Sequence, residues 1–346
     1  MAAAGVDVLV DSTRWGVIGY VETYIRLPIF VPRFLALTRL IDRVRPDLLL
    51  LIDFPGMNRE LIRHYSGRIP MVYFFPPHTY GRRGRSAARM AQAAVRLLAV
   101  LPFEAEAYRR AGADVVYIGH PAVDAAAAVA ASRPALRKEW EIEEGLLIGL
   151  LPGSRNQEVR TLLPSMLEAA GVLRATHGAR FVLPLAAPHL RRAVDRAVAR
   201  SGVPVRIVEG RALDVMAAAD VIIVASGTAP VEAACVGVPM VVVYRLSRLT
   251  EWIVRRLVAT PDVGREGLSV PSITVGRPIV PELIQDDVTG TRISAEVGRL
   301  LDSATRARVS VDLAEVRRRL GPPGVLDRAA AETLRVLDSR PAGTLR

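Results

Sequence analysis

A loop of small and charged residues follows the apolar run 146–151 in the second half of the chain. It contains Gly153, Ser154, Arg155 and Glu158, and a helical pattern begins directly after it. A glycine permits a tight turn and a close approach of the backbone, the first N–H groups of a helix attract anions, and an arginine offers a fork of donors to phosphate oxygens. We predict a phosphate-binding loop; an ordinary strand–helix turn with Ser154 as N-cap is the alternative.

A second small-residue turn, formed by Ser226, Gly227 and Thr228, follows the apolar run 221–224. This turn has room to cradle a diphosphate, and Glu232, in the next helical turn, offers acceptors for two ribose hydroxyls. Alternatively, Glu232 only complements the helix dipole, which is worth about 0.3–1 kcal/mol. Two such loops in one half of the chain favour a nucleotide diphosphate as ligand.

The fingerprints of two common nucleotide sites are absent. No G-x-G-x-x-G follows a strand-like run, and no G-x-x-x-x-G-K-[ST] occurs. This disfavours nicotinamide-dependent enzymes and P-loop ATPases, and an activated donor such as a UDP-sugar fits better. The five histidines and the single cysteine show no metal-ligand spacing, so we expect no metal site and no bound cofactor.

In the first half of the chain, Asp53 directly follows the apolar run 48–52. A carboxylate at the end of a strand can act as general base toward an acceptor hydroxyl, which contributes roughly 10²–10⁴ in rate. The alternative is that Asp53 caps the helix that Pro55 begins.

The loop 75–85 mixes aromatic and basic side chains. His78, Tyr80 and Arg82 are predicted to contact a phosphorylated acceptor, with His78 either a second base or a loop histidine without a catalytic role. As an indication of nucleic-acid binding the loop is weak, because loop arginines are usually solvated.

The segment 15–40 has an apolar face edged by arginines. Its large apolar side chains include Trp15, Ile18, Tyr20, Phe30 and Phe34. A face of this kind suits the surface of an anionic membrane, and the alternative is a helix packed on its own sheet.

Short apolar runs alternate with helical stretches, which is typical of βαβ units and parallel sheets. The first set of strand-like runs is 6–10, 47–52, 71–75, 95–101 and 115–118, and the second is 146–151, 181–185, 205–208, 221–224 and 240–243. We predict an α/β chain with two Rossmann-like domains facing a cleft, with ligands at the carboxyl ends of the strands. The boundaries are 1–135 for an acceptor and lipid domain, 136–305 for a UDP-sugar domain and 306–346 for a helical segment.

Composition narrows the class of protein further. The chain has 346 residues, a net charge of +11 and one cysteine, so a disulfide framework is excluded and a cytoplasmic protein with anionic partners is expected. No apolar run approaches the length of a membrane span, and the N-terminus does not read as a signal peptide.

Several short motifs occur in a fixed order. They are M-A-A-A-G-V at 1–6 with G-V-I-G-Y-V-E at 16–22, D-F-P-G-M-N at 53–58, L-P-F-E at 101–104, G-H-P at 119–121, L-P-G-S-R at 151–155 with E-V at 158–159, A-S-G-T at 225–228 with E-A at 232–233, Y-R at 244–245, and G-R at 276–277 with P-E-L-I-Q at 281–285. Together they cover nearly the whole chain. In this set the chain resembles the lipid-A-disaccharide synthase family of GT-B glycosyltransferases.

The resemblance implies a metal-free reaction with two lipid substrates. A 2,3-diacylglucosamine unit of UDP-2,3-diacylglucosamine is transferred with inversion to 2,3-diacylglucosamine 1-phosphate, on the inner face of the cytoplasmic membrane. Asp53 then matches the family's general base and Arg155 its essential phosphate-loop arginine. The implied UDP-sugar contacts are Gly153, Ser154, Glu158, Ser226, Gly227, Thr228, Glu232, Arg277, Glu282 and Gln285. The resemblance also implies that the C-terminal segment packs back on its own chain or is exchanged in a homodimer, and nucleic acid is not an expected partner.

The chain departs from the family pattern in three places. The strand–helix–strand unit with G-E-x-S-G-D that opens the family lies ahead of Met1, so the N-terminal domain is expected to be incomplete. Ser272 stands where the family has an asparagine, and the aromatic loop at 77–83 is altered. The alternatives are another UDP-GlcNAc-using GT-B enzyme and a non-catalytic UDP-sugar or lipid-binding remnant.

Overall fold

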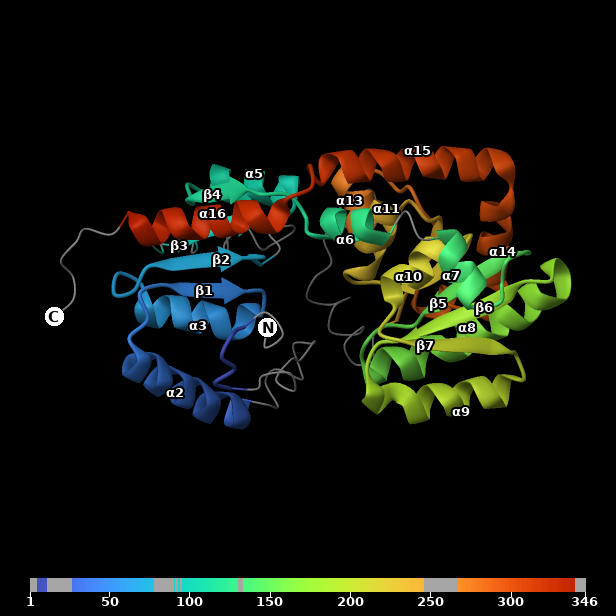
Figure 1. Cartoon of the computed structure of the whole chain (residues 1–346), viewed down its shortest axis with the longest axis horizontal. Coiled ribbons are helices and arrows are strands. Elements are labelled where there is room, and N and C mark those ends of the chain that lie inside the picture. The colour runs from blue at the N-terminus through green and yellow to red at the C-terminus, as the bar shows by residue number, and fades with distance from the viewer. Residues whose placement is uncertain are drawn as a thin grey trace.

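The computed structural model describes residues 5–10, 27–77, 90, 93, 95–129, 133–245 and 267–339. These residues form two sheets with helices packed around them, and Figure 1 shows the two sheets side by side as separate bodies. Every strand pairing in both sheets is parallel. The predicted class, an α/β chain with two parallel sheets, is confirmed.

The first sheet has the order β1-β2-β3-β4. Its strands are β1 (Leu49–Ile52), β2 (Met71–Phe74), β3 (Val95–Ala99) and β4 (Val115–Tyr117), and its helices are α2 (Leu27–Val44), α3 (Pro55–Tyr65) and α5 (Pro102–Arg110). Side chains alternate between two cores: Tyr73 packs with Met57 and Leu61 of α3, whereas Val72 and Leu98 belong to the larger core of the molecule. Strands buried on both faces explain why these runs are almost continuously apolar.

The second sheet has the order β10-β9-β8-β5-β6-β7. Its strands are β5 (Leu147–Leu151), β6 (Arg180–Leu185), β7 (Val205–Glu209), β8 (Val221–Ala225), β9 (Met240–Tyr244) and β10 (Glu282–Ile284). Its helices are α6 (Ala122–Val129), α7 (Arg133–Glu139), α8 (Asn156–His177), α9 (Arg191–Ser201), α10 (Ala212–Ala218), α11 (Ala229–Val236), α13 (Val270–Val275), α14 (Gly290–Leu301) and α15 (Ser303–Arg319), with short 3₁₀ turns η4 (Pro188–Leu190) and η5 (Gln285–Asp287). Most of the buried apolar side chains lie in this half.

The chain passes between the two sheets twice, once after β4 and once after α15, and these two segments are in contact. After α15, the helix α16 (Val325–Asp338) returns to the first sheet and contacts β2, as the red helix in Figure 1 shows. Where the crossings meet, the N–H of His120 donates to the carbonyl of Leu320 at 2.9 Å. The Asp124 carboxylate caps α16 by accepting from the N–H groups of Gly324 at 2.6 Å and Val325 at 2.9 Å. These bonds tie the end of the chain to its middle.

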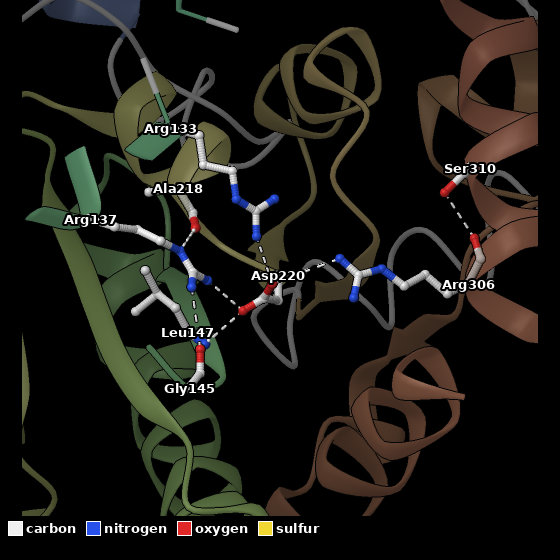
Figure 2. A network of polar contacts seen from close by, with 8 residues as sticks. All are labelled: Arg133, Arg137, Gly145, Leu147, Ala218, Asp220, Arg306 and Ser310. Carbon is white, nitrogen blue, oxygen red and sulfur yellow. Dashed lines mark hydrogen bonds and ion pairs between the residues drawn. The ribbon is translucent and has the colours of Figure 1, made fainter. Parts of the chain in front are cut away.

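A polar network closes the second sheet at the edge where its strands begin (Figure 2). Asp220, directly before β8, accepts from Arg133 and Arg137 of α7 at 2.6 Å each and from the N–H of Leu147 at 2.9 Å, and Arg306 of α15 lies 3.8 Å away. Burial alone raises the pKa of this carboxyl, but the Leu147 hydrogen bond and the charges of Arg137 and Arg133 outweigh it, so its pKa lies below the ordinary value. The network joins α7, the sheet and α15.

Two strand predictions differ from the structure. The segment 6–10 was predicted as a strand but is irregular, and its Val6, Val8 and Leu9 are exposed because it pairs with no strand of the described chain. The strand β10 was not predicted, because a run of three residues that begins with Glu282 has no apolar periodicity. The other nine predicted strands are present within a few residues.

Replacement of Asp220 by asparagine tests the network. Asp220→Asn keeps the size of the side chain but leaves two arginines without their counter-charge, so we expect a loss of about 3 kcal/mol in the free energy of unfolding at pH 7, measured by urea denaturation followed by circular dichroism. Since the pKa of Asp220 is lowered by folding, its contribution is present at neutral pH and is lost as the pH falls below about 4. Asp195→Asn, which breaks an exposed pair with Arg191, is the matched control and should cost less than about 1 kcal/mol. An equal effect of both substitutions would contradict the structural role of Asp220.

Candidate functional site

Loops from four neighbouring strands meet at one edge of the second sheet. Strands β10, β9, β8 and β5 lie next to one another in this order, and their pairings are parallel. Their carboxyl ends therefore point to the same edge. This edge gathers the loop 152–155 after β5, the turn 226–228 after β8, Tyr244 and Arg245 at the end of β9, and Gln285 after β10.

The loop after β5 is built around the carboxylate of Glu158. Its Oε2 accepts from the N–H groups of Ser154 at 3.0 Å and Arg155 at 3.2 Å, and its Oε1 pairs with Nη1 of Arg155 at 2.6 Å. Gly153 has a φ of +100°, and a β-carbon at this position would collide with the Glu158 side chain. Only glycine fits here, because both the backbone conformation and the packed carboxylate exclude a side chain.

These contacts revise the prediction for the first N–H groups of α8. The N-cap is Arg155, not Ser154, and a capping box joins it to Glu158. The anion that the loop attracts in this structure is thus the chain's own carboxylate. The Arg155 side chain remains 54% exposed, so its guanidinium is accessible from solvent.

The turn after β8 leads directly into α11. The N–H of Ser226 donates to the carbonyl of Val243 at 2.9 Å, and Gly227 adopts a φ of +148°. Glu232 lies half-buried in the first turn of α11, and burial raises the pKa of its carboxyl above the ordinary value. In the part of the chain that the structure describes, no side chain offsets this cost by donating to Glu232. Its oxygens are open to a ligand donor.

The structure adds Tyr244 and Arg245 to this edge, which the residue patterns alone did not single out as site residues. Arg245 donates to three backbone carbonyls, those of Thr161 at 3.1 Å, Gln285 at 3.3 Å and Val288 at 2.7 Å, and so fixes the loops after β9 and β10 against α8. Burial raises the pKa of the Tyr244 hydroxyl, and nearby Glu158 adds to this effect. The sequence feature that could have predicted Tyr244 and Arg245 as site residues is their position directly after the apolar run 240–243.

Glu282 has an internal role in this structure. It accepts from the N–H groups of Leu268 at 2.6 Å and Ser269 at 3.1 Å, and from the hydroxyls of Ser269 at 2.6 Å and Ser272 at 2.8 Å. Ser272 is fully buried and belongs to this network. The carboxylate therefore anchors the start of α13 to β10, and the structure does not present it with the open oxygens of Glu232.

Arg277 is separated from the other predicted UDP-sugar contacts. It precedes β10, on the side where the parallel strands begin, and its guanidinium pairs with Asp312 and Glu315 of α15 at 2.9 Å each. A cavity of about 560 Å³ lies beside it, and α14 and α15 supply its other walls. The structure thus places Arg277 at the opposite edge of the sheet from Arg155 and Glu232.

Asp53 lies at the carboxyl end of the first sheet with an exposed side chain. Its N–H donates to the carbonyl of Phe74 at 3.0 Å, which extends the β1–β2 pairing by one residue. Asp53 and the following Phe54 both have positive φ, +44° and +48°, and α3 begins directly after them. Asp53 makes no cap hydrogen bond to α3, and the N-cap position belongs to Phe54, so the helix-cap alternative is wrong.

Only some of the residues predicted to contact the acceptor or the membrane lie in the described part of the chain. Phe30 and Phe34 of α2 pack against the core beneath the first sheet, whereas Val31 and Leu35 on the same helix are 48% and 46% exposed. The apolar face that α2 leaves open is therefore offset by one residue from the one predicted. The predicted residues outside the described part of the chain are Trp15, Ile18, Tyr20, His78, Tyr80 and Arg82.

Two kinds of feature are absent from the described residues. No group of three or more His, Cys, Asp or Glu side chains there has the arrangement to hold a metal ion. No helix among the same residues is long and apolar enough to cross a membrane.

Solved structures share the fold. A UDP-GlcNAc 2-epimerase from Neisseria meningitidis bound to UDP-GlcNAc matches with a TM-score of 0.61 and 12% identity, over 87% of this chain and 80% of that one. A structure described as a putative UDP-N-acetylglucosamine 2-epimerase from Listeria monocytogenes matches with a TM-score of 0.57 and 14% identity, over 90% and 80%. At these identities the likeness shows the two-sheet GT-B architecture only.

Relatives found by sequence are much more similar to this chain than these solved structures are. Lipid-A-disaccharide synthases from Geobacter metallireducens and Geobacter sulfurreducens are 35% and 36% identical over 344 and 341 residues, which cover 98% and 97% of this chain and 88% and 87% of theirs. The family model for lipid-A-disaccharide synthetase matches residues 1–331. The chain therefore belongs to the lipid-A-disaccharide synthetase family of glycosyltransferases.

Proposed function

We propose that the chain transfers 2,3-diacylglucosamine from UDP to 2,3-diacylglucosamine 1-phosphate and releases UDP. The observation that carries the proposal is the identity of about 35% to lipid-A-disaccharide synthases over 97–98% of the chain. The site supports it, because the exposed guanidinium of Arg155, the small-residue turn 226–228 and the half-buried carboxylate of Glu232 share one edge of the second sheet.

In the proposed reaction the 6-hydroxyl of the acceptor attacks the anomeric carbon of the donor. Asp53 takes the hydroxyl proton, a carbon–oxygen bond forms on one side of the anomeric carbon, and the bond to the UDP oxygen breaks on the other. A single displacement of this kind inverts the anomeric centre. The leaving UDP gains negative charge, which Arg155 and the N–H groups at the start of α11 stabilise.

For the donor, we assign the ribose to Glu232 and the diphosphate to the turn 226–228 and the loop 153–155. The carboxylate of Glu232 is partly desolvated by burial and receives no side-chain hydrogen bond from the described residues, so two ribose hydroxyls would supply donors to it. The Glu158 carboxylate holds the phosphate loop in shape before the donor arrives, and Gln285 borders the same edge. In this proposal Arg277 and Glu282 do not contact the donor. They stabilise the surrounding structure through their bonds to α15 and to the start of α13.

For membrane contact, we assign the open face of α2. Val31 and Leu35 are exposed one turn apart, and Arg39 and Arg43 follow on the exposed surface of the same helix. Apolar side chains next to arginines suit insertion at an anionic lipid surface, where both acyl substrates reside. The site would then act from the cytoplasmic face of the membrane.

Asp53→Asn tests the assignment of the base. The substitution keeps the shape of the side chain but removes its proton acceptor, so we expect kcat to fall by about 10²–10⁴ with little change in the affinity for UDP. The tetra-acyl disaccharide is quantified by mass spectrometry, and UDP affinity is measured by calorimetry. Turnover within threefold of the wild type would exclude Asp53 as the base.

Arg155→Ala tests the stabilisation of the leaving group. Because the guanidinium is assigned to charge that develops as UDP leaves, we expect kcat to fall by about 10²–10³. Arg160→Ala, on the exposed side of the next turn of α8, is the matched control and should leave turnover unchanged. Equal activity of the two variants would remove Arg155 from the mechanism.

Val31→Asp combined with Leu35→Asp tests the membrane face. Two apolar side chains are lost from the contact, so we expect at least tenfold weaker co-sedimentation with vesicles that contain anionic phospholipid. Val311→Asp, which changes an exposed valine of α15, should bind as the wild type does. Unchanged binding of the α2 variant would show that another surface contacts the membrane.

A further inference from the structure

The backbone that carries Asp53 is held in an unfavourable conformation. Asp53 and Phe54 have φ values of +44° and +48°, and neither is a glycine. Each such residue is destabilising and persists only where its surroundings enforce it. A glycine would adopt these angles without steric cost, yet this sequence has a carboxylate and a phenyl ring here. The question is which contacts enforce the turn.

Two side chains converge on a single atom, the main-chain carbonyl oxygen of Asp53. Tyr73 donates its hydroxyl to this oxygen at 2.9 Å, and the amide Nδ2 of Asn58 donates to it as well. The same Asn58 nitrogen lies 3.4 Å from the carbonyl of Ile52. Both lone pairs of the Asp53 carbonyl are thus occupied, while its N–H is bound to Phe74.

Both donors are rigidly placed. Tyr73 is fully buried in β2, the strand that pairs with β1 over its whole length, and its ring belongs to the core shared by α2 and α3. Asn58 lies in the first turn of α3 and is 7% exposed. The turn is therefore fixed from the sheet on one side and from the helix on the other.

The Asp53 side chain itself receives no comparable support. Its carboxylate is exposed, and its hydrogen bonds in the described part of the chain are made by its main-chain atoms. Among the described residues, the direction of the carboxylate is then set through the backbone that carries it. A return of Asp53 to negative φ would swing the Cα–Cβ bond away and re-aim the carboxylate.

We infer that Asn58 and Tyr73 are positioning residues that hold the Asp53 carboxylate on the acceptor hydroxyl by clamping the carbonyl of Asp53 in a left-handed turn. The inference rests on the proposed function, in which Asp53 is the general base. It adds two residues that touch neither substrate and act through the aim of the base.

The test removes the two donors singly and together. Tyr73→Phe deletes only the hydroxyl, and Asn58→Ala deletes the amide. Since a misplacement of about 1 Å can cost 10²-fold, we expect kcat to fall about tenfold in each single variant and about a hundredfold in the double variant. The donor KM and the affinity for UDP should stay within twofold of the wild type, because the UDP site lies on the other sheet.

Tyr65→Phe is the matched control. Tyr65 is also fully buried in the first domain, and its hydroxyl donates to the carbonyl of Thr38 at 3.0 Å and to Asp42 at 2.9 Å, away from Asp53. It should lose a comparable amount of thermal stability while kcat stays within twofold. An equal fall in kcat for Tyr65→Phe and Tyr73→Phe, or an unchanged kcat in Tyr73→Phe, would overturn the inference.

A crystal structure of the Asn58→Ala/Tyr73→Phe variant separates this inference from the proposed function. The clamp predicts that φ of Asp53 turns negative when both donors are absent, and retention of positive φ would overturn it. If the double variant does not fold, the structure of Tyr73→Phe decides, with a shift of the Asp53 carbonyl expected. Absence of disaccharide product from the wild type would refute the proposed function, and the conformation of Asp53 would still decide the clamp.

Discussion

Parallel pairing is the constraint on which the rest of the structure depends. A chain that builds a parallel sheet must return to the same starting edge after each strand, so every loop that follows a strand lies at the opposite edge. In the second sheet this brings loops from β5, β8, β9 and β10 together, although 130 or more residues separate the first from the last. The edge at which the strands begin carries none of these loops. There the Asp220 network joins the second sheet to the helices beside it (Figure 2).

Carboxylates organise this site in two different ways. Glu158 and Glu282 each accept backbone N–H groups and hold a loop in shape, so these loops are preorganised by the chain's own anions. Glu232 carries a desolvation cost without such compensation in the described structure. A buried acceptor without donors is where a ligand hydroxyl gains most. The distinction separates residues that build the site from a residue available to bind.

Much of this could be predicted from the sequence, and the failures have physical causes. Nine strands and the loops after them were predictable because buried parallel strands are almost continuously apolar, but β10 is too short to show this pattern. Gly153 was predicted to allow the close approach of a ligand, and the structure adds the Glu158 carboxylate, which packs against it. The hydrogen bond from Tyr73 to the Asp53 carbonyl could not be predicted, because in the sequence Tyr73 is simply one residue of an apolar strand. Tertiary hydrogen bonds between strands and helices leave no periodic signal in a sequence.

The proposed reaction is a single displacement on a UDP-activated acyl sugar, and the linkage of the product tests it most directly. The chain would be incubated with UDP-2,3-diacylglucosamine and 2,3-diacylglucosamine 1-phosphate, and the purified disaccharide would be analysed by proton NMR. We predict a β-1,6 linkage with the large anomeric coupling of an inverted centre, formed in step with UDP. An α linkage, or UDP release without any disaccharide, would contradict the account.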